Sequence, residues 1–280
     1  MKKRKQLLCI AFLVVLAIQG SLLLSNPAYA ADSAANTTLR FPETGSKTKT
    51  ANRLTIDYSH MDQGYVIVRA KKSNKQMQLS VSHGSDTVHY EMNGNGKHEI
   101  IPLQFGSGEY KFTLLISRKK GCNRYDRAGT ITLKCNMPDE SSCFLYPNQY
   151  VNYEADSPLV KETQRLCKDL NTPMEVVKTI CSYVRSHFCY DWVKCNAIKS
   201  NQAENILPDI AATWKTGKGI CQDLSALTCA MLRSQGIHAT LVIGSADGSY
   251  HAWVVIMVDG KNKFFDPSFS ARIYRAERYY

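Results

Sequence analysis

The chain has 280 residues, with 35 basic and 24 acidic side chains, a formal net charge of +11 and 10 cysteines. This length exceeds one typical domain, and we expect two modest domains behind a leader. The basic residues are spread along the sequence without a cluster, which argues against a nucleic-acid-binding protein. Outside the cell, screened Coulomb attraction would keep such a protein near anionic cell-wall polymers, which are candidate partners.

Residues 1–30 have the three parts of a secretory signal peptide. Basic residues at Lys2–Lys5 precede an apolar run from Leu7 to Leu24, and Ala28-Tyr29-Ala30 supplies the small residues that a signal peptidase requires. The alternative is a retained membrane anchor, but polar residues interrupt the apolar run before it reaches spanning length. We therefore expect cleavage after Ala30, a secreted or cell-surface protein, and no stable membrane span afterwards.

The cysteines fit an exported protein with at least one free thiol. Cleavage would remove Cys9 and leave an odd number of cysteines, nine of the ten. Cys122 and Cys135, and likewise Cys189 and Cys195, are close enough in sequence for disulfides. The alternative is that many of these side chains are buried and reduced, and the sequence leaves both possibilities open.

A flexible tether and a β domain are expected next. Residues 31–50 are rich in Ala, Ser, Thr and Asn, which predicts the tether. Residues 51–136 contain short runs that alternate apolar and polar side chains between glycine-containing turns. Such runs predict strands with one buried face in an all-β, sandwich-like domain. The runs are Leu54–Tyr58, Tyr65–Arg69, Met77–Val81, Tyr110–Leu114 and Thr130–Leu133.

This β region contains no convincing catalytic cluster. Its three histidines, His83, His89 and His98, lack the local spacing that metal-ligand sets usually show. We therefore expect them to be solvated surface side chains and predict no metal site among them.

Helical signals begin after residues 137–157, which we expect to form a linker. Ser157-Pro158 and Thr172-Pro173 each combine a capping hydroxyl with a proline at the first helical position. Residues 158–280 are therefore expected to form a second domain with helices, which makes the whole chain an α+β protein.

Cys221 is the candidate nucleophile because it is expected to begin a helix. Apolar side chains follow it at helical spacing as far as Leu232, and Gly236 stands where a left-handed residue would end the helix. A thiol at a helix N-terminus lies near the positive end of the helix dipole, which favours the nucleophilic thiolate. Without partners, Cys221 would be read as a buried structural thiol like Cys229 on the same helix.

His251 and Asp266 supply those partners. His251 and Trp253 are two residues apart on a predicted strand and so face the same side. The hairpin at Asp259–Asn262 returns the chain and brings Asp266 beside the strand of His251. A thiolate that attacks, an imidazole that transfers a proton and a carboxylate that holds the imidazole are the groups that thiol-dependent acyl transfer needs.

These motifs resemble the transglutaminase core, over roughly Pro158 to Phe269, and the layout is similar to secreted bacterial transglutaminase-like proteins with a preceding β domain. The resemblance implies a papain-like α+β fold in which helices pack on an antiparallel sheet. It further implies a thioester acyl-enzyme at Cys221 that passes its acyl group to an amine or to water, without metal or organic cofactor. The matching segments are Gly219–Leu227, Met231–Ile237, Tyr250–Trp253, Asp266-Pro267 and, at the domain junction, Phe144–Tyr150.

The resemblance also suggests supporting residues. Tyr190 stands where the family has an aromatic residue that supports the oxyanion, with the Cys221 amide as the second donor; the alternative is an ordinary core aromatic. Trp214 and Trp253 are candidate cleft walls, although tryptophans near a nucleophile are as often plain packing. The strand after His251 lacks the acidic residue that many relatives carry.

Two functional hypotheses follow from the sequence. The first is an exported thiol-dependent acyltransferase or amide or peptide hydrolase that acts on protein or peptide substrates at the cell surface. The alternative is a non-catalytic cell-surface or cell-wall binding module that recognises its target through the β domain. The complete set of Cys221, His251 and Asp266 favours the enzyme.

Overall fold

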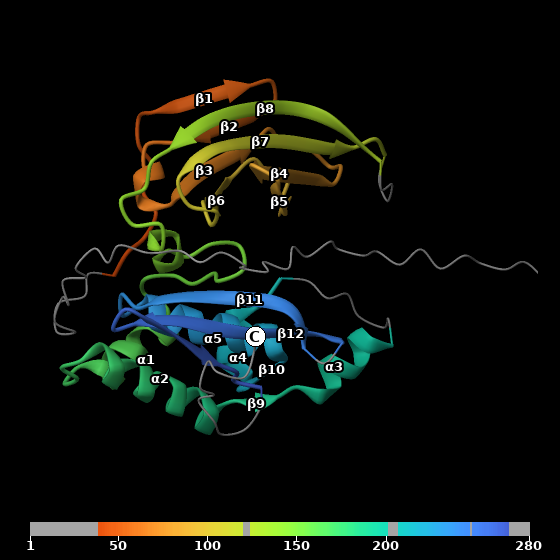
Figure 1. Cartoon of the computed structure of the whole chain (residues 1–280). Coiled ribbons are helices and arrows are strands. Elements are labelled where there is room, and N and C mark those ends of the chain that lie inside the picture. The colour runs from red at the N-terminus through yellow and green to blue at the C-terminus, as the bar shows by residue number, and fades with distance from the viewer. Residues whose placement is uncertain (1–38, 120–123, 201–206, 247, 269–280) are drawn as a thin grey trace, which may run out of the picture.

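A computed structural model describes residues 39–119, 124–200, 207–246 and 248–268. Figure 1 shows a β domain above a second domain of helices and strands, with a short connecting segment between them. The expected α+β class is confirmed, with the β-rich domain first and helices packed on an antiparallel sheet second. The predicted signal peptide lies outside the described residues. Within those residues, no helix has the length and apolar character needed to cross a membrane.

The β domain consists of two four-stranded antiparallel sheets, ordered β1-β2-β3-β6 and β5-β4-β7-β8. Apolar side chains from both sheets, such as Ile56, Leu79 and Phe112, form one buried core. All five predicted strands are present, but β1, β5 and β6 were not predicted because their residues are mostly polar or half-exposed. The strands are β1 (Thr48–Ala51), β2 (Leu54–Asp57), β3 (Tyr65–Ala70), β4 (Met77–His83), β5 (Asp86–Met92), β6 (His98–Pro102), β7 (Gly108–Ser117) and β8 (Tyr125–Cys135).

Two expectations for this region need correction. Within the tether predicted for residues 31–50, Leu39 and Phe41 lie against the core of the second domain, whereas residues 43–50 are exposed and Thr48 begins β1. The Phe41 ring meets Tyr153 edge-on at 5.5 Å. His83 is half-buried instead of solvated, because its ring packs 4.8 Å from that of Tyr110. Composition alone did not reveal these contacts, which join residues distant in sequence.

The described cysteines are all thiols. Seven of the eight are buried, and Cys189 is exposed. Cys135 lies with its Sγ 3.2 Å from the Met61 carbonyl oxygen, and burial raises the pKa of its thiol to about 11. The possible pair of Cys189 and Cys195 is therefore not a disulfide, and Cys122 lies outside the described residues.

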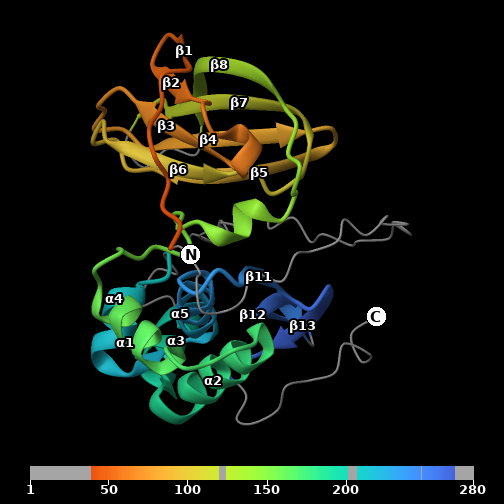
Figure 2. The same ribbon diagram turned by 90° about the vertical axis from the view of Figure 1, so that its left-hand side faces the viewer.

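The expected linker is a packed junction. Its 3₁₀ helix, Ser142–Leu145, lies between the domains in Figure 2. The side chain of Arg233, only 2% exposed, donates from Nη1 to the Tyr146 carbonyl at 2.7 Å and from Nε to the Ala239 carbonyl at 2.9 Å. The Tyr146 hydroxyl in turn donates to Gln63 Oε1 at 2.7 Å. The junction thus contacts both domains through buried or half-buried hydrogen bonds.

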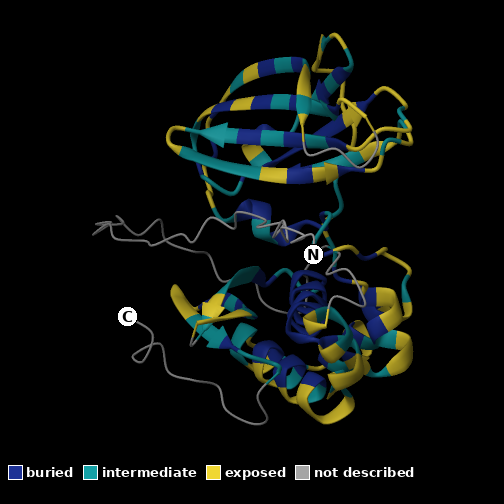
Figure 3. Cartoon of the chain, turned by 90° about the vertical axis from the view of Figure 1, so that its right-hand side faces the viewer, coloured by how far each residue is buried: buried dark blue, intermediate teal, exposed yellow. Residues whose placement is uncertain are grey.

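The second domain is built around helix α5 (Cys221–Arg233), in which every residue is buried. Figure 3 shows α5 in dark blue, surrounded by other elements. It packs on strands β11 and β12 of the antiparallel sheet β11-β12-β13 and on helices α1, α2 and α4. The remaining elements are α1 (Pro158–Cys167), α2 (Pro173–His187), β9 (Cys189–Tyr190), α3 (Trp192–Lys199), α4 (Ile210–Thr216), β10 (Lys218–Gly219), β11 (His238–Ala246), β12 (Ser249–Val258) and β13 (Lys261–Phe265).

The predicted helix ends are confirmed where capping residues are present. The Ser157 and Thr172 hydroxyls accept hydrogen bonds from the first turns of α1 and α2. Gly236 has φ of +69° after α5, which is the left-handed conformation expected there. These local signals determine where α1 and α2 begin and where α5 ends.

We predict that Arg233→Met lowers the free energy of unfolding by about 3 kcal/mol, because two buried carbonyl groups lose their charged donor. Urea denaturation measures this difference. Arg165→Met is the matched control, since Arg165 forms only an exposed pair with Glu162 and its loss should change stability little. Equal effects of the two substitutions would contradict the role assigned to Arg233.

Candidate active site

Cys221 occupies the first position of α5 and is 5% exposed. Asp223 fixes this turn, because its Oδ2 accepts the Ile220 amide at 3.0 Å. Gly219 permits the close approach of the preceding strand, since a Cβ at that position would lie 2.7 Å from the Cβ of Asp223. The predicted placement of the thiol at a helix N-terminus is therefore what the structure shows.

His251 lies between Asp266 and Cys221. It sits on β12, and Asp266 follows the end of β13, the neighbouring strand. His251 Nε2 lies 2.6 Å from Asp266 Oδ2, and the ring also forms a hydrogen bond with Cys221. Because Nε2 is engaged by the carboxylate, Nδ1 is the nitrogen that faces the thiol. The Ser225 hydroxyl donates to the Ala252 carbonyl at 3.2 Å and ties α5 to the histidine strand.

The electrostatics of this group favour a protonated imidazole. The hydrogen bond with Asp266 and, next, that with Cys221 raise the pKa of His251 to about 9, although burial opposes the shift. The ring is thus an imidazolium at neutral pH, and a neighbouring cation stabilises a thiolate. Asp266 is itself positioned, since its Oδ1 accepts the Ser268 amide at 2.9 Å.

Tyr190 lies beside the nucleophile, as the resemblance implied. Strand β9 pairs in parallel with β10, which places Tyr190 opposite Gly219. The Tyr190 hydroxyl accepts the backbone N–H of Cys221 and donates to Cys195 Sγ at 3.6 Å. Burial raises the pKa of Tyr190, so its hydroxyl stays protonated. The two candidate oxyanion donors are thus in contact with each other.

The two tryptophans differ in their surroundings. The Trp253 ring stacks 6.1 Å from the His251 ring at 28° between planes, as expected for side chains two apart on a strand. Trp214 instead packs 5.8 Å from Phe188 and 6.3 Å from Tyr183, against the core around α2. Trp253 therefore remains a candidate wall of the site, whereas Trp214 belongs to core packing.

An ion pair that sequence reasoning missed lies behind the nucleophile. Lys194 Nζ lies 2.6 Å from Asp223 Oδ2, and the Asp223 side chain is 0% exposed. Asp191 caps α3 through the Lys194 amide at 2.8 Å and so holds Lys194 in place. The ammonium offsets the negative charge of the buried Asp223 carboxylate. No local spacing signals this pair, whose members are 29 residues apart.

Exposed apolar side chains flank the thiol. Of the large hydrophobic side chains in the described part of the chain, four are exposed: Trp192, Val193, Tyr250 and Met257. The Trp192 ring lies 4.7 Å from Tyr190, and the Tyr250 hydroxyl donates to Gln222 Oε1 at 2.6 Å. Two exposed aromatic rings thus contact residues that adjoin Cys221 on separate elements.

We predict that Asp266→Asn lowers the pKa of His251 from about 9 toward its ordinary value of 6.5, because the charged acceptor is removed. NMR titration of the His251 ring measures this shift. Since the folded pKa is raised, the contact stabilises the fold fully below about pH 6.5 and loses this effect as the pH rises through about 9. Asp169→Asn, an exposed change, is the control. An unchanged His251 titration in Asp266→Asn would contradict the assignment.

Comparison with protein families finds a match within the second domain. The family model described as the transglutaminase-like superfamily matches residues 161–267. That segment contains Cys221, His251 and Asp266, and the β domain lies outside it. No curated protein matches the chain.

Solved structures with some likeness share little sequence. A TGase is 23% identical with a TM-score of 0.35, and the match covers 44% of this chain but only 33% of the TGase. A protein proposed as a cysteine protease from Cytophaga hutchinsonii is 16% identical with a TM-score of 0.39, over 73% of this chain and 71% of that one. The periplasmic domain of TgpA from Pseudomonas aeruginosa is 12% identical with a TM-score of 0.34, over 80% and 94% of the respective chains. Residues 161–267 of this chain form a domain of the transglutaminase-like superfamily.

Proposed function

We propose that this chain is an exported thiol-dependent acyltransferase or amide hydrolase that works through a thioester at Cys221. The observation that carries the proposal is the position of His251, which is hydrogen-bonded to Asp266 at 2.6 Å and to the thiol at the start of a buried helix. This is the grouping that nucleophilic catalysis by a thiol requires. The proposal needs neither a metal nor an organic cofactor, because the nucleophile and the proton carrier are both side chains.

The first half-reaction breaks an amide bond. The Cys221 thiolate attacks the carbonyl carbon, a C–S bond forms, and the carbonyl oxygen becomes an oxyanion. When the tetrahedral intermediate collapses, the C–N bond breaks and His251 donates its Nδ1 proton to the leaving amine. A thioester and a neutral imidazole held by Asp266 remain. The raised pKa of His251, about 9, keeps the acid form available at neutral pH.

The second half-reaction regenerates the thiol. An amine or a water molecule approaches the thioester, and His251 Nδ1 takes its proton as the new bond to carbon forms. The C–S bond then breaks, and Cys221 leaves as the thiolate beside the imidazolium. An amine acceptor gives transfer, and water gives hydrolysis. We favour hydrolysis over transfer, and the product analysis below distinguishes the two.

Tyr190 and the Cys221 amide are placed to stabilise the oxyanion. In the structure, the Cys221 N–H donates to the Tyr190 hydroxyl, and that hydroxyl donates to Cys195. A substrate oxygen that takes the place of the tyrosine as acceptor of this N–H would also lie near the tyrosine O–H. The backbones that carry the two donors are held by α5 and by the pairing of β9 with β10, and substrate binding would redirect both donors from their present partners to the oxyanion.

The surroundings of the thiol fit a protein or peptide substrate. Trp192 and Tyr250 are 65% and 44% exposed and contact residues that adjoin Cys221. Exposed aromatic rings near a nucleophile suit a chain with apolar side chains next to the reacting amide. Export by the predicted signal peptide places this reaction at the cell surface.

The product mixture from a glutamine-containing peptide with flanking apolar residues, incubated with a primary amine, tests the proposal. Mass spectrometry distinguishes deamidation, backbone cleavage and amine incorporation. We expect one of these products with the wild type and none with Cys221→Ala, while Cys229→Ala, another buried thiol of α5, remains active if folded. Products that persist in Cys221→Ala would contradict the proposal. Absence of all three products from a library of peptides would favour the non-catalytic binding module.

We predict that Tyr190→Phe lowers kcat by about 100-fold, because one oxyanion donor is lost. The rate of Cys221 alkylation by iodoacetamide should change much less, since no oxyanion forms in that reaction. Tyr183→Phe serves as the control, because Tyr183 packs against Phe188 and Trp214 in the core. If Tyr190→Phe retains full kcat, or loses alkylation and turnover equally, Tyr190 is a structural residue only.

A further inference from the structure

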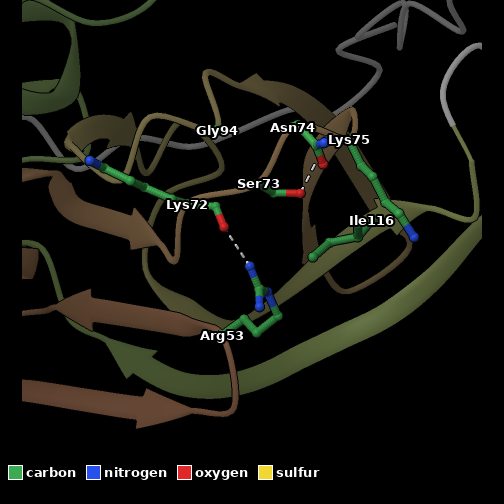
Figure 4. A pocket seen from close by; sticks show the side chains of 7 residues that line it. All are labelled: Arg53, Lys72, Ser73, Asn74, Lys75, Gly94 and Ile116. Carbon is green, nitrogen blue, oxygen red and sulfur yellow. Dashed lines mark hydrogen bonds between the residues drawn. The ribbon is translucent and has the colours of Figure 1, made fainter.

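A basic pocket lies in the β domain, in a part of the chain that the catalytic proposal does not use. It has a volume of about 670 Å³ and is lined by Arg53, Lys72, Ser73, Asn74, Lys75, Gly94 and Ile116. Figure 4 shows Arg53 below the loop of residues 72–75, with the Lys72 and Lys75 side chains reaching toward opposite sides. Three of the lining side chains are cations, and none is acidic.

The pocket is held by contacts between four separate segments. Arg53, in the turn between β1 and β2, donates from Nη2 to the carbonyls of Lys71 and Lys72 at 3.2 and 2.7 Å. The Ser73 amide donates to the Gly94 carbonyl, between β5 and β6, at 3.0 Å. Lys75 Nζ donates to the carbonyl of Arg118, just after β7, at 2.9 Å. The loop of residues 71–76 is thus fixed before any ligand binds, which lowers the entropy cost of binding.

The three cations of the pocket form no ion pair with a carboxylate of the described residues. In the described ranges, the carboxylates that form ion pairs do so with other cations, and none pairs with Arg53, Lys72 or Lys75. Asp126 forms an ion pair with Arg118 at 2.9 Å. Glu99 accepts hydrogen bonds from Asn93, the neighbour of the lining residue Gly94. Arg53 Nε is buried without a hydrogen-bond partner. Folding therefore gathers at one place basic residues that the sequence distributes over several segments.

We propose that this pocket binds the phosphate groups of a flexible linear polyanion. A single small anion at Arg53 would not reach both lysines, whose side chains extend in opposite directions in Figure 4, whereas a chain crossing the pocket meets all three cations in turn. The neutral donors Ser73 and Asn74 stand beside the cations. This mixture of arginine, lysine, hydroxyl and amide donors is the one that proteins use for phosphate oxygens.

Such a site would hold the protein at an anionic surface while the second domain acts on its substrate. Cys221 and the pocket lie in different domains, so binding at one leaves the other open. The inference is independent of the proposed reaction, because it depends only on the β domain.

The test measures binding of the full mature chain to fluorescently labelled inorganic polyphosphate by anisotropy over a range of salt concentrations. Lys72→Gln/Lys75→Gln should weaken binding at least about tenfold and lower the slope of log affinity against log salt by about 2. Lys161→Gln/Lys168→Gln is the charge-matched control, since both lysines are exposed on or next to α1. It should change binding little, and Cys221 alkylation should be normal in both variants.

Four outcomes would overturn the inference. Equal loss in both double variants would show that overall charge, not the pocket, attracts the polymer. If unlabelled inorganic phosphate displaces the labelled polymer as well as unlabelled polyphosphate does, at equal phosphate concentration, the pocket does not require a polymeric ligand. Poly-glutamate that binds as tightly as polyphosphate would remove the preference for phosphate. No binding of polyphosphate by the wild type at low salt would end the proposal.

Discussion

The first turn of helix α5 carries polar groups into a buried environment, and pairing of most of them organises the site, whereas Asp223 Oδ1 has no hydrogen-bond partner among the described residues. A buried polar group without a partner costs about 1–3 kcal/mol, so such groups are almost always satisfied. The Asp223 carboxylate takes the Ile220 amide and the Lys194 ammonium. Gln222 receives the Tyr250 hydroxyl, and the Cys221 amide donates to Tyr190. The first turn of the helix that carries the thiol therefore contacts β12, β9 and α3 through side-chain hydrogen bonds or an ion pair.

The same pairing explains why the chemistry and the fold are coupled. His251 lies between a carboxylate and the thiol, and these two hydrogen bonds raise its pKa to about 9. The strand that carries it is tied to α5 through the Ser225 hydroxyl and the Ala252 carbonyl. A shift of the helix would therefore change the distance from Cys221 to the imidazole. Because the hydrogen bond with Cys221 helps to raise the pKa of His251, such a shift would also change that pKa. Rigid support of this kind is what a preorganised site needs.

The sequence predicted the parts of the structure that have local signals. Capping residues such as Ser157, the glycines before Cys221 and the two-residue spacing of His251 and Trp253 were read correctly because each acts over a few residues. Long-range contacts were not predictable in this way. Lys194 with Asp223, Phe41 on Tyr153 and the core position of Trp214 depend on tertiary packing that no spacing reports. The basic pocket was also not predictable from local sequence, since Arg53, Lys72 and Lys75 come together only after the two sheets form.

The proposed thioester between Cys221 and a carboxamide-derived acyl group is tested most directly by trapping that adduct. The chain is incubated with a reactive acyl donor, such as an activated ester of a glutamine-like peptide, and quenched at acid pH. Peptide mapping by mass spectrometry then locates the acyl group. We expect one adduct on Cys221 that neutral hydroxylamine removes. No adduct on Cys221, or an adduct on the exposed Cys189 alone, would contradict it.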